Sequence, residues 1–484
     1  MSGTFSRRDF MIRSAALSGG LILAACTPKP QSTPVPAPAT QPKAKEKAPP
    51  PAPAQEKVTV RYASWWGLFI TTVLPDCIKD FQDQNPNVTI ELEEVPYGEA
   101  ETNYTPTLVA GTAADILYHM NFMSRYYDQG LILRLDDYMA ADDIDYWNDF
   151  YLGLGIDDWA GKIYGFPHMF ETYLVLYNKT MIEEHWGRDL WEAFPDGNWD
   201  EADMLEILDA CTQDLNGDGK IDQWGMHKTH RSYYYGLETF PWTRGDNIFD
   251  VQNVKYNFTS PTVQKTARDL LRWVSKDHYI IAQEDISEIS AAAGMGPFYS
   301  GFVGLHFRMS PDVGTALRTV GDRFEWDVFY LPNYGANQAI TRAGGHGHNV
   351  AKSSKVPQEA YEFSKFLGTT PGMTYVAKTK VSIPIYRKDP SLRRLFETRE
   401  PRHDHAIMGV LEDRAGYFDH MRFHNEGECL SLFINEMALL YTEPYEQASA
   451  RLERTYARLE EEMNAIVDYG NELPFIGIRF PFTV

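Results

Sequence analysis

From residue 58 onward the chain switches repeatedly between strand-like alternation and helix-like periodicity of its apolar positions. Residues 58–66 and 88–95 alternate apolar and polar side chains, which predicts two strands. The segment 74–86 between them carries apolar side chains at helical spacing and ends at an Asn-Pro pair, which stops a helix. A second helical stretch, 105–111, leads to an apolar strand from Asp115. This order of elements predicts a parallel sheet covered by helices on both faces.

The same two patterns continue toward the C-terminus. Further strands are predicted at 173–178, 300–307 and 326–332, and further helices at 260–276, 356–368 and 446–469. The last helix carries a single apolar stripe, which predicts docking on the body of the protein rather than a coiled coil. The body from Val58 to Val484 has 427 residues and no internal repeat, so its length favours two α/β lobes over one core.

The N-terminus differs from the rest and predicts export. Arg7 and Arg8 precede an apolar run, residues 14–25, that is too short to span a bilayer as a mature helix. The arginine pair with this run resembles a twin-arginine export signal. The run ends in Leu-Ala-Ala-Cys, which resembles a bacterial lipobox and predicts lipid on Cys26. A chance basic and apolar N-terminus is the alternative.

The segment that follows predicts a tether. Residues 27–57 contain ten prolines and one large aliphatic side chain, Val35, so they cannot bury a core and are expected to be disordered. With residues 1–26 as the signal, we expect an extracytoplasmic protein that meets the membrane only through its lipid anchor. A partner-binding role of the prolines is the alternative to a spacer.

Charge and cysteine content narrow the function classes. The formal charge is −22, and because the leader and tether are basic, the body alone carries −27. A body of this charge repels phosphate backbones, so we expect no nucleic-acid partner. Apart from Cys26, the chain contains Cys77, Cys211 and Cys429, whose spacing fits neither a disulfide framework nor a zinc site. We predict buried free thiols.

Six segments carry a resemblance to a known family. They are ASWWG (63–67), FQDQNPNVTIELEEVPYGE (81–99), LVAGTAADIL (108–117), GKIYGFPHMFETYLVLYNK (161–179), NWDEADMLEIL (198–208) and SKVPQEAYEFSKFLGTTPG (354–372). In this order and spacing they resemble family 1 extracellular solute-binding proteins, the maltose-binding-protein-like lipoprotein receptors of carbohydrate ABC importers. The resemblance covers the chain from residue 58 to about 480.

The resemblance implies a fold and its domain boundaries. The fold is the type II periplasmic-binding-protein-like α/β fold, with two lobes joined by a hinge of three crossovers. By position the crossovers fall near Pro167, near 344–347 and near Pro384. Lobe I is then expected to comprise residues 58–167 and 345–383, and lobe II residues 168–344 and 384–484.

The resemblance also implies a function. We expect a monomeric receptor that captures a sugar, an oligosaccharide or another polar solute in the cleft between the lobes and delivers it to ABC permease subunits. We expect no enzyme and no catalytic cofactor, and the chain lacks the GxSxG, HExxH and GxxxxGK[ST] motifs. A glycoside-acting enzyme stays open, because two carboxylates leave no local motif. A sensing or adhesion lipoprotein on the same fold is the other alternative.

The candidate ligand-binding residues come partly from the strand pattern and partly from the resemblance. They are Trp65, Trp66, His119, Asn121, Glu171, Tyr233, Tyr234, Tyr235, Trp242, Arg308, His346 and His348. The first four follow predicted strands, and ligands of open α/β sheets bind beyond the carboxyl ends of the strands. Aromatic planes and carboxylates suit the apolar faces and hydroxyls of a sugar. For most aromatic residues core packing is the alternative, and the cleft is favoured for Trp66 and one of the three tyrosines.

The remaining candidates rest on the resemblance and on position. Glu171 aligns with a sugar-contacting carboxylate, and residues 233–235 and Trp242 occupy a stretch where the family places stacking aromatics. Arg308 stands where the family often has a tryptophan, which would allow a charged contact. His346 and His348 lie at the second crossover, where hydrogen bonds to the ligand or hinge are favoured over a metal because no third metal ligand is nearby.

Residues 214–225, DLNGDGKIDQWG, resemble a calcium loop. Its first, third, fifth, seventh and ninth positions are Asp214, Asn216, Asp218, Lys220 and Asp222, with the lysine offering its carbonyl. The twelfth position, normally a bidentate Glu, is Gly225. We predict a structural calcium site that requires a remote carboxylate or water. A polar turn without a cation is the alternative, because these ligands fall short of the number calcium prefers.

Overall fold

The computed structural model describes residues 56–119, 123–151, 157–232, 236–237, 239–250, 255–335, 337–398, 400–417 and 426–467. The predicted signal, Cys26 and the tether up to residue 55 lie outside these ranges. All of the described residues belong to one compact unit, residues 55–484. Every described helix and strand belongs to the body.

Nine strands form a mixed sheet in the described part of the chain, in the order β2-β1-β3-β12-β6-β10-β7, with β11 paired to β6 and β13 to β12. Their bounds are β1 (Val58–Ser64), β2 (Val88–Glu94), β3 (Ile116–Tyr118), β6 (Gly165–Asn178), β7 (Trp224–Lys228), β10 (Val303–Met309), β11 (Trp326–Phe329), β12 (Thr341–Val350) and β13 (Ala415–Tyr417). Two small sheets pair β4 (Asp158–Trp159) with β5 (Lys162–Ile163) and β8 (Phe249–Asp250) with β9 (Lys255–Tyr256). The parallel β2-β1-β3 unit confirms the opening pattern of the sequence.

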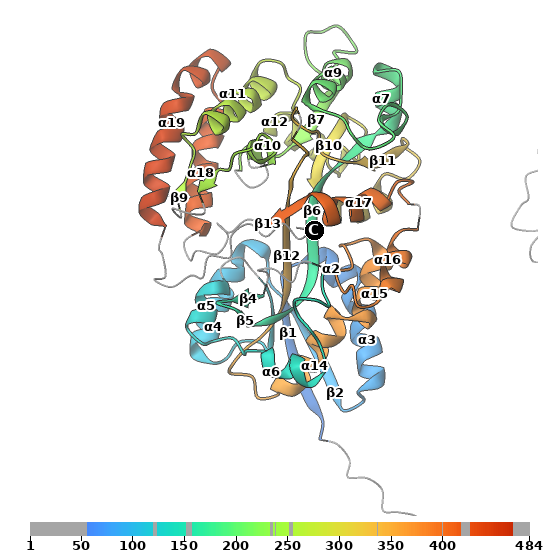
Figure 1. Cartoon of the computed structure of the whole chain (residues 1–484), viewed down its shortest axis with the longest axis vertical. Helices are drawn as coiled ribbons and strands as arrows, with labels where there is room; N and C mark the ends of the chain where they lie inside the picture. Colours follow the sequence, from blue (N-terminus) through green and yellow to red (C-terminus); the bar gives the residue numbers. More distant parts are fainter. Residues whose placement is uncertain are drawn as a thin grey trace, which may run out of the picture. The chain divides into compact units, whose positions relative to one another are not determined.

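Two long strands connect the halves of this sheet. Residues 165–172 of β6 pair with β12, and its residues 173–178 pair with β10 and β11. On its other side, β12 pairs with β3 through residues 348–350. Both strands run between the group of elements around β1 and the group around β10 (Figure 1). These strands contain two of the three predicted crossovers; the lobe boundaries stay a prediction.

Helices cover the sheet. They are α2 (Gly67–Thr72), α3 (Leu74–Gln84), α4 (Ala100–Ala110), α5 (Ser124–Asp128), α6 (Asp136–Ala141), α7 (Lys179–His185), α8 (Leu190–Ala193), α9 (Glu201–Cys211), α10 (Thr239–Thr243), α11 (Pro261–Ser275), α12 (Gln283–Ala293), α13 (Pro311–Thr319), α14 (Pro357–Gly368), α15 (Thr370–Thr379), α16 (Pro390–Phe396), α17 (His405–Gly409), α18 (Glu426–Leu440) and α19 (Tyr445–Ile466). Short helical turns span Tyr97–Glu99 and Val410–Arg414. No helix in the described ranges is both long and apolar enough to cross a membrane.

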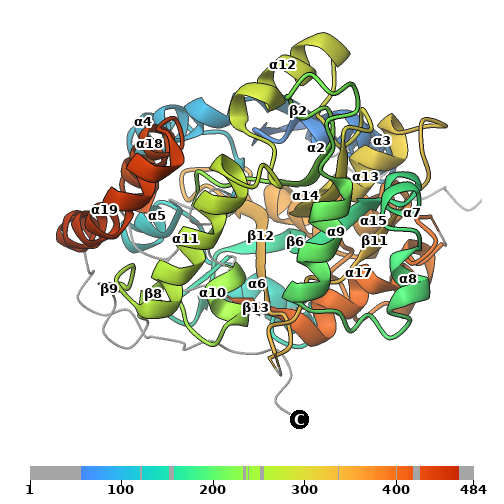
Figure 2. The same cartoon turned by 90° about the horizontal axis from the view of Figure 1, so that it is seen from above.

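Local sequence sets where these helices begin. Ser260 caps α11 by accepting from the backbone N–H of Val263, and a proline fills the first helical position. Asp200 and Asp203 form a reciprocal capping box at the start of α9. The apolar stripe of α19 packs into the core shared with α11 and α18, and these helices lie side by side in Figure 2. The predicted docking of the last helix on the body is confirmed.

Two large cores lie against the two halves of the sheet. The first includes Val60 of β1 and Phe363 of α14, and the second includes Leu305 of β10 and Leu271 of α11. Cys77, Cys211 and Cys429 are buried and form no disulfide with one another, as predicted.

Candidate functional site

The ends of β1 and β3 bring aromatic side chains together with the crossover strand β12. Trp66 stacks on Tyr118, with ring centroids 6.1 Å apart and planes 17° apart. Trp65 meets His346 edge to face at 5.0 Å, and its indole N–H donates to the carbonyl of His119 over 3.1 Å. Four of the candidates, Trp65, Trp66, His119 and His346, therefore meet around Tyr118.

Glu171 belongs to the other crossover strand, and its charge acts on the same cluster. It lies on β6 opposite Gly344 of β12, and its side chain is largely buried, with 6% of the residue exposed. Burial raises the pKa of Tyr118 well above its ordinary value, and the charges of Tyr62 and Glu171 raise it further. The Tyr118 hydroxyl itself is buried and has no hydrogen-bond partner among the described residues.

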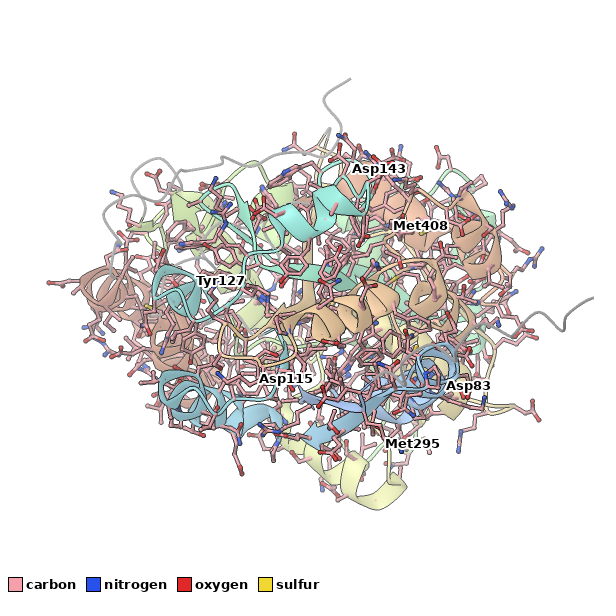
Figure 3. The ribbon with its side chains drawn as sticks, turned by 90° about the horizontal axis from the view of Figure 1, so that it is seen from below. Asp83, Asp115, Tyr127, Asp143, Met295 and Met408 are labelled. Atoms are coloured by element: carbon pink, nitrogen blue, oxygen red, sulfur yellow. The ribbon has the colours of Figure 1, made fainter. Side chains whose placement is uncertain are left out.

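His119, next to Tyr118 in the chain, belongs to a network of polar side-chain contacts. Its Nδ1 lies 3.0 Å from Oδ1 of Asp157 and 3.2 Å from the hydroxyl of Tyr127 on α5. The Nδ2 of Asn349 donates to the same Asp157 oxygen over 3.0 Å and to the Tyr127 hydroxyl over 3.1 Å. Tyr127 is labelled in Figure 3, at the short helix α5. Sequence reasoning missed Asp157 and Asn349, because no motif marks them.

His346 and His348 do not share one environment. The register of β12 against β6 shifts between His346 and Gly347, so that His346 is half-buried and His348 fully buried. His348 Nδ1 lies 3.1 Å from the hydroxyl of Tyr62. His168 of β6, which sequence reasoning did not single out, lies 4.7 Å from the His348 ring and 4.3 Å from Phe69.

Burial keeps both inner histidines neutral. It lowers the pKa of His168 from 6.5 to about 3. Burial, followed by the neighbouring His168, lowers the pKa of His348 well below its ordinary value. These two rings therefore pack the crossover, while His346 stays beside Trp65 and Tyr118.

On the other half of the sheet, Lys228 ends β7 in a buried aromatic setting. Its ammonium lies 5.1–5.6 Å from the ring centroids of Tyr173, Phe240 and Phe307, and it donates to the Thr239 hydroxyl over 3.2 Å. Such cation–π contacts partly replace water around a buried charge. Sequence reasoning missed Lys228, since a lysine at a strand end is ordinarily exposed.

The remaining candidates on this half differ in their surroundings. Trp242 on α10 is buried, while Tyr233, Tyr234 and Tyr235, like Asn121 on the first half, lie outside the described residues. Nε of Arg308 donates to Oδ2 of Asp312 over 2.6 Å. Burial alone would raise the pKa of Asp312, but Arg308 and His306 hold it below its ordinary value. The charge of Arg308 is therefore engaged by a carboxylate, and its contact with a ligand stays a prediction.

The 214–225 loop is closed by its own backbone. Asp214 accepts from the N–H groups of Gly217 at 2.7 Å and Gly219 at 2.8 Å, and Asp222 accepts from that of Leu215 at 2.9 Å. The Gly219 bond, with other backbone donors, lowers the pKa of Asp214. Across the described residues, no three His, Cys, Asp or Glu side chains are grouped closely enough to hold a metal ion. The calcium site at Asp214, Asn216, Asp218, Lys220 and Asp222 stays a prediction.

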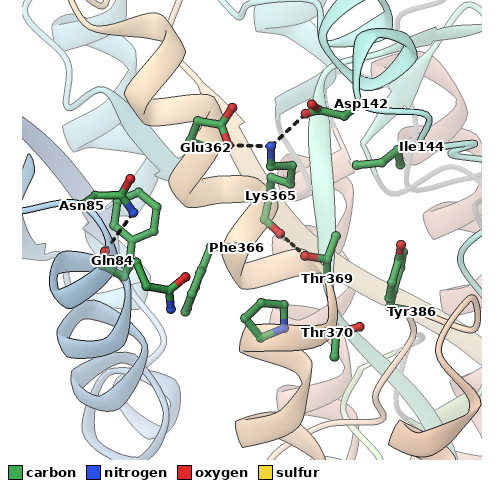
Figure 4. A pocket seen from close by; sticks show the side chains of 12 residues that line it. Gln84, Asn85, Asp142, Ile144, Glu362, Lys365, Phe366, Thr369, Thr370 and Tyr386 are labelled. Carbon is green, nitrogen blue, oxygen red and sulfur yellow. Dashed lines mark hydrogen bonds and ion pairs between the residues drawn. The ribbon is translucent and has the colours of Figure 1, made fainter. Parts of the chain in front are cut away.

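A pocket of about 610 Å³ lies between α3, α14 and α15 (Figure 4), and it does not include the aromatic cluster around Tyr118. Its apolar walls include Phe81, Phe366 and Tyr386, and Lys365 bridges Asp142 at 2.9 Å and Glu362 at its rim. None of the candidate ligand-binding residues lines it. Its charged groups, Lys365, Asp142 and Glu362, are paired with one another.

The chain belongs to the bacterial extracellular solute-binding protein family, whose sequence profile matches residues 76–389. Putative binding proteins of Brucella abortus (strain 2308) and Brucella suis biovar 1 are 26% identical to it over 165 residues. That stretch is 33% of this chain and spans only 38% of each of those relatives.

Solved structures of low sequence identity share the fold. An ABC substrate-binding protein from Listeria monocytogenes, in complex with cycloalternan, has a TM-score of 0.70 and 16% identity, with 84% of this chain and 99% of that chain covered. The maltose/maltodextrin-binding domain from Bdellovibrio bacteriovorus, bound to maltotriose, has a TM-score of 0.63 and 15% identity, covering 83% and 99%. A solute-binding protein from Thermotoga lettingae bound to α-D-tagatose has a TM-score of 0.67 and 13% identity, covering 86% and 100%. The predicted solute-binding fold and family are confirmed.

Proposed function

We propose that this protein is the extracytoplasmic receptor of an ABC importer, which captures a sugar or oligosaccharide between its two lobes and delivers it to the permease. The observation that carries the proposal is the cluster of Trp66, Tyr118 and Glu171 at the crossover strands. The protein shares its fold with proteins whose structures contain cycloalternan, maltotriose and tagatose.

The chemistry of the cluster suits a sugar. The C–H faces of a pyranose ring pack on aromatic planes, and its hydroxyls donate to carboxylates in fixed directions. The half-buried Trp66 offers such a plane. Glu171 offers acceptor oxygens on the strand that continues into the other half of the sheet. A solute held there would touch both halves.

The crossover strands supply a route from binding to transport. A ligand that contacts both lobes favours the closed arrangement by its differential affinity, with β6 and β12 as part of the hinge. The permease would then recognise the closed receptor. Lipid on Cys26 and the proline-rich tether would keep the receptor at the membrane surface, in keeping with the family's extracellular location.

A melting-temperature screen tests the proposal. The purified chain is heated with cycloalternan, maltotriose, tagatose, glycerol 3-phosphate and a mixture of amino acids. A sugar that binds only the native state at 100 times its Kd stabilises that state by about 2.7 kcal/mol, which raises the melting temperature. We expect one or more sugars to do so and the amino acids to have no effect. A shift with amino acids alone would refute a sugar receptor, and hydrolysis of an oligosaccharide during incubation would favour the enzyme alternative.

A further inference from the structure

The two crossover strands leave space for one buried carboxylate. Asp157 is fully buried, and a Cβ added at Gly347 of β12 would lie 1.7 Å from its Oδ2. A Cβ at Gly165 of β6 would lie 2.8 Å from its Oδ1. Neither glycine has a positive φ, so space rather than backbone conformation requires glycine at both positions.

The carboxylate fixes the proton on the imidazole beside it. Oδ1 of Asp157 receives the Asn349 amide and also faces Nδ1 of His119 at 3.0 Å. This oxygen acts as an acceptor, so a short contact with Nδ1 requires the proton to be on that nitrogen. The hydrogen bond that one ring nitrogen makes thus determines whether the other nitrogen carries a proton.

The other ring nitrogen is left for a ligand. In the neutral ring, a proton on Nδ1 makes Nε2 of His119 a hydrogen-bond acceptor. Nε2 has no hydrogen-bond partner among the described residues, although only 8% of His119 is exposed. The ring lies 5.9 Å from that of His346, and Trp65 donates to the His119 carbonyl, so this acceptor belongs to the Trp65–Trp66 cluster.

We propose that Asp157 is a positioning residue of the ligand site, which holds His119 with its proton on Nδ1 so that Nε2 accepts a hydrogen bond from a hydroxyl of the solute. The inference rests on the proposed function and restricts the class of solute that the receptor can bind. The solute must present a donor at this point, which a sugar hydroxyl does and a carboxylate or phosphate oxygen does not.

Ring NMR of the ligand-free chain tests the first half of the inference. Long-range ¹H–¹⁵N correlation of ¹⁵N-histidine-labelled protein at pH 8, with His119→Gln to assign the signal, should place the proton on Nδ1. Tyr127→Phe removes the other contact of Nδ1 and should leave the proton there. Asp157→Leu should move the proton to Nε2. Asp157→Asn should keep it on Nδ1, because the Asn349 amide donates to the position of Oδ1 and therefore favours the amide oxygen of the new side chain at that position. A proton on Nε2 in the wild type, or a change with Tyr127→Phe alone, would overturn the inference.

Calorimetry tests the second half, with whichever of cycloalternan, maltotriose and tagatose raises the melting temperature most. His119→Phe and Asp157→Leu should each weaken binding about tenfold, and the double variant no more than His119→Phe, because Asp157 acts through His119. Asp157→Asn should stay within about twofold of the wild type. Additive losses, or unchanged affinity in Asp157→Leu, would overturn the inference while the proposed function stands. If no sugar binds the wild type, the proposed function fails, and the NMR result still decides the state of the ring.

Discussion

His168 shows how a single residue can be hidden from sequence reasoning. The register of β6 pairs Pro167 with Gly347 and Met169 with His346, so His168 is the extra residue of an irregularity. Proline lacks an N–H for the ladder and is tolerated at such bulges. The ring is buried, and within the described part of the chain neither of its nitrogens has a hydrogen-bond partner. Nothing in the local sequence indicates this, because it depends on pairing with a strand about 180 residues later.

His168 should make the protein acid-sensitive. Its pKa is about 3 when folded against 6.5 ordinarily, so below pH 6.5 the unfolded chain binds a proton that the folded chain does not. Its contribution to stability is fully present above pH 6.5 and falls by about 1.4 kcal/mol per pH unit toward pH 3. In urea unfolding from pH 7 to 4, His168→Phe should therefore flatten the pH dependence. His405→Gln, at an exposed histidine, is the control and should leave it unchanged; equal slopes for all three proteins would contradict the assignment.

Trp65 and Trp66, in contrast, could be predicted, because a tryptophan pair directly after a first strand lies at the carboxyl edge of the sheet. The structure brings them together with His119, as expected, but also with Asp157 and Tyr118, which no motif connects to them. Spacing along the chain thus identified the residues that directly follow strands and missed Asp157 and Tyr118.

Trp66→Ala and Glu171→Ala should weaken sugar binding by tenfold or more and change the free energy of unfolding of the ligand-free protein by no more than about 1 kcal/mol. The reason is that Trp66 is only half-buried, although its indole stacks against Tyr118 and Phe69. Calorimetry and urea unfolding measure the two effects. Trp147→Ala, at an exposed indole outside the cluster, is the matched control. A loss of about 3 kcal/mol or more with unchanged affinity would place Trp66 in the core.

At the scale of elements, the periodic segments were predictable and the crossover strands were not. β1, β2, α3, α11, α14 and α19 lie within a few residues of their predicted ranges. The strand predicted at 173–178 begins instead at Gly165, because β6 is buried along its whole length and shows no alternation. Pro167, which has no N–H to donate to a neighbouring strand, also disfavours a strand at this point.

Gly347→Ala tests the close approach of β12 to Asp157. The added methyl group would meet Oδ2 of Asp157 and the carbonyl of Phe166, so we expect a loss of about 3 kcal/mol in the free energy of unfolding. Gly427→Ala, in helix α18 with open space around it, is the control and should be neutral or slightly stabilising. Equal stability of the two variants in urea unfolding would show that the carboxylate is not held between the strands.

The loop of residues 214–225 follows α9 and leads into β7, as predicted. Whether it binds calcium can be tested by its effect on the melting temperature. Three carboxylates on one short loop repel one another unless a cation lies between them. Calcium should therefore raise the melting temperature, EDTA should lower it, and Asp218→Ala should abolish the difference while sugar affinity changes little. Identical melting curves in calcium and EDTA would leave the loop as the polar turn that its backbone hydrogen bonds already form.

At the scale of the whole molecule, the two halves of the sheet are joined by strands that themselves carry candidate ligand residues. Glu171 lies on β6 and His346 on β12, and the His346 ring contacts Trp65 of the aromatic cluster. A ligand at this cluster would act on the hinge directly. Fold and family could be predicted from the order of the six segments, whereas the identity of the solute depends on side-chain positions that the chain order does not define.

The most direct measurement is a crystal structure of the protein with the sugar that raises its melting temperature most. We predict sugar density against the face of Trp66, with a hydroxyl donating to Glu171 and another to Nε2 of His119. Sugar found only in the pocket lined by Phe81, Phe366 and Tyr386, or a cluster that stays empty at saturating sugar, would contradict a receptor that binds its solute at the crossover strands.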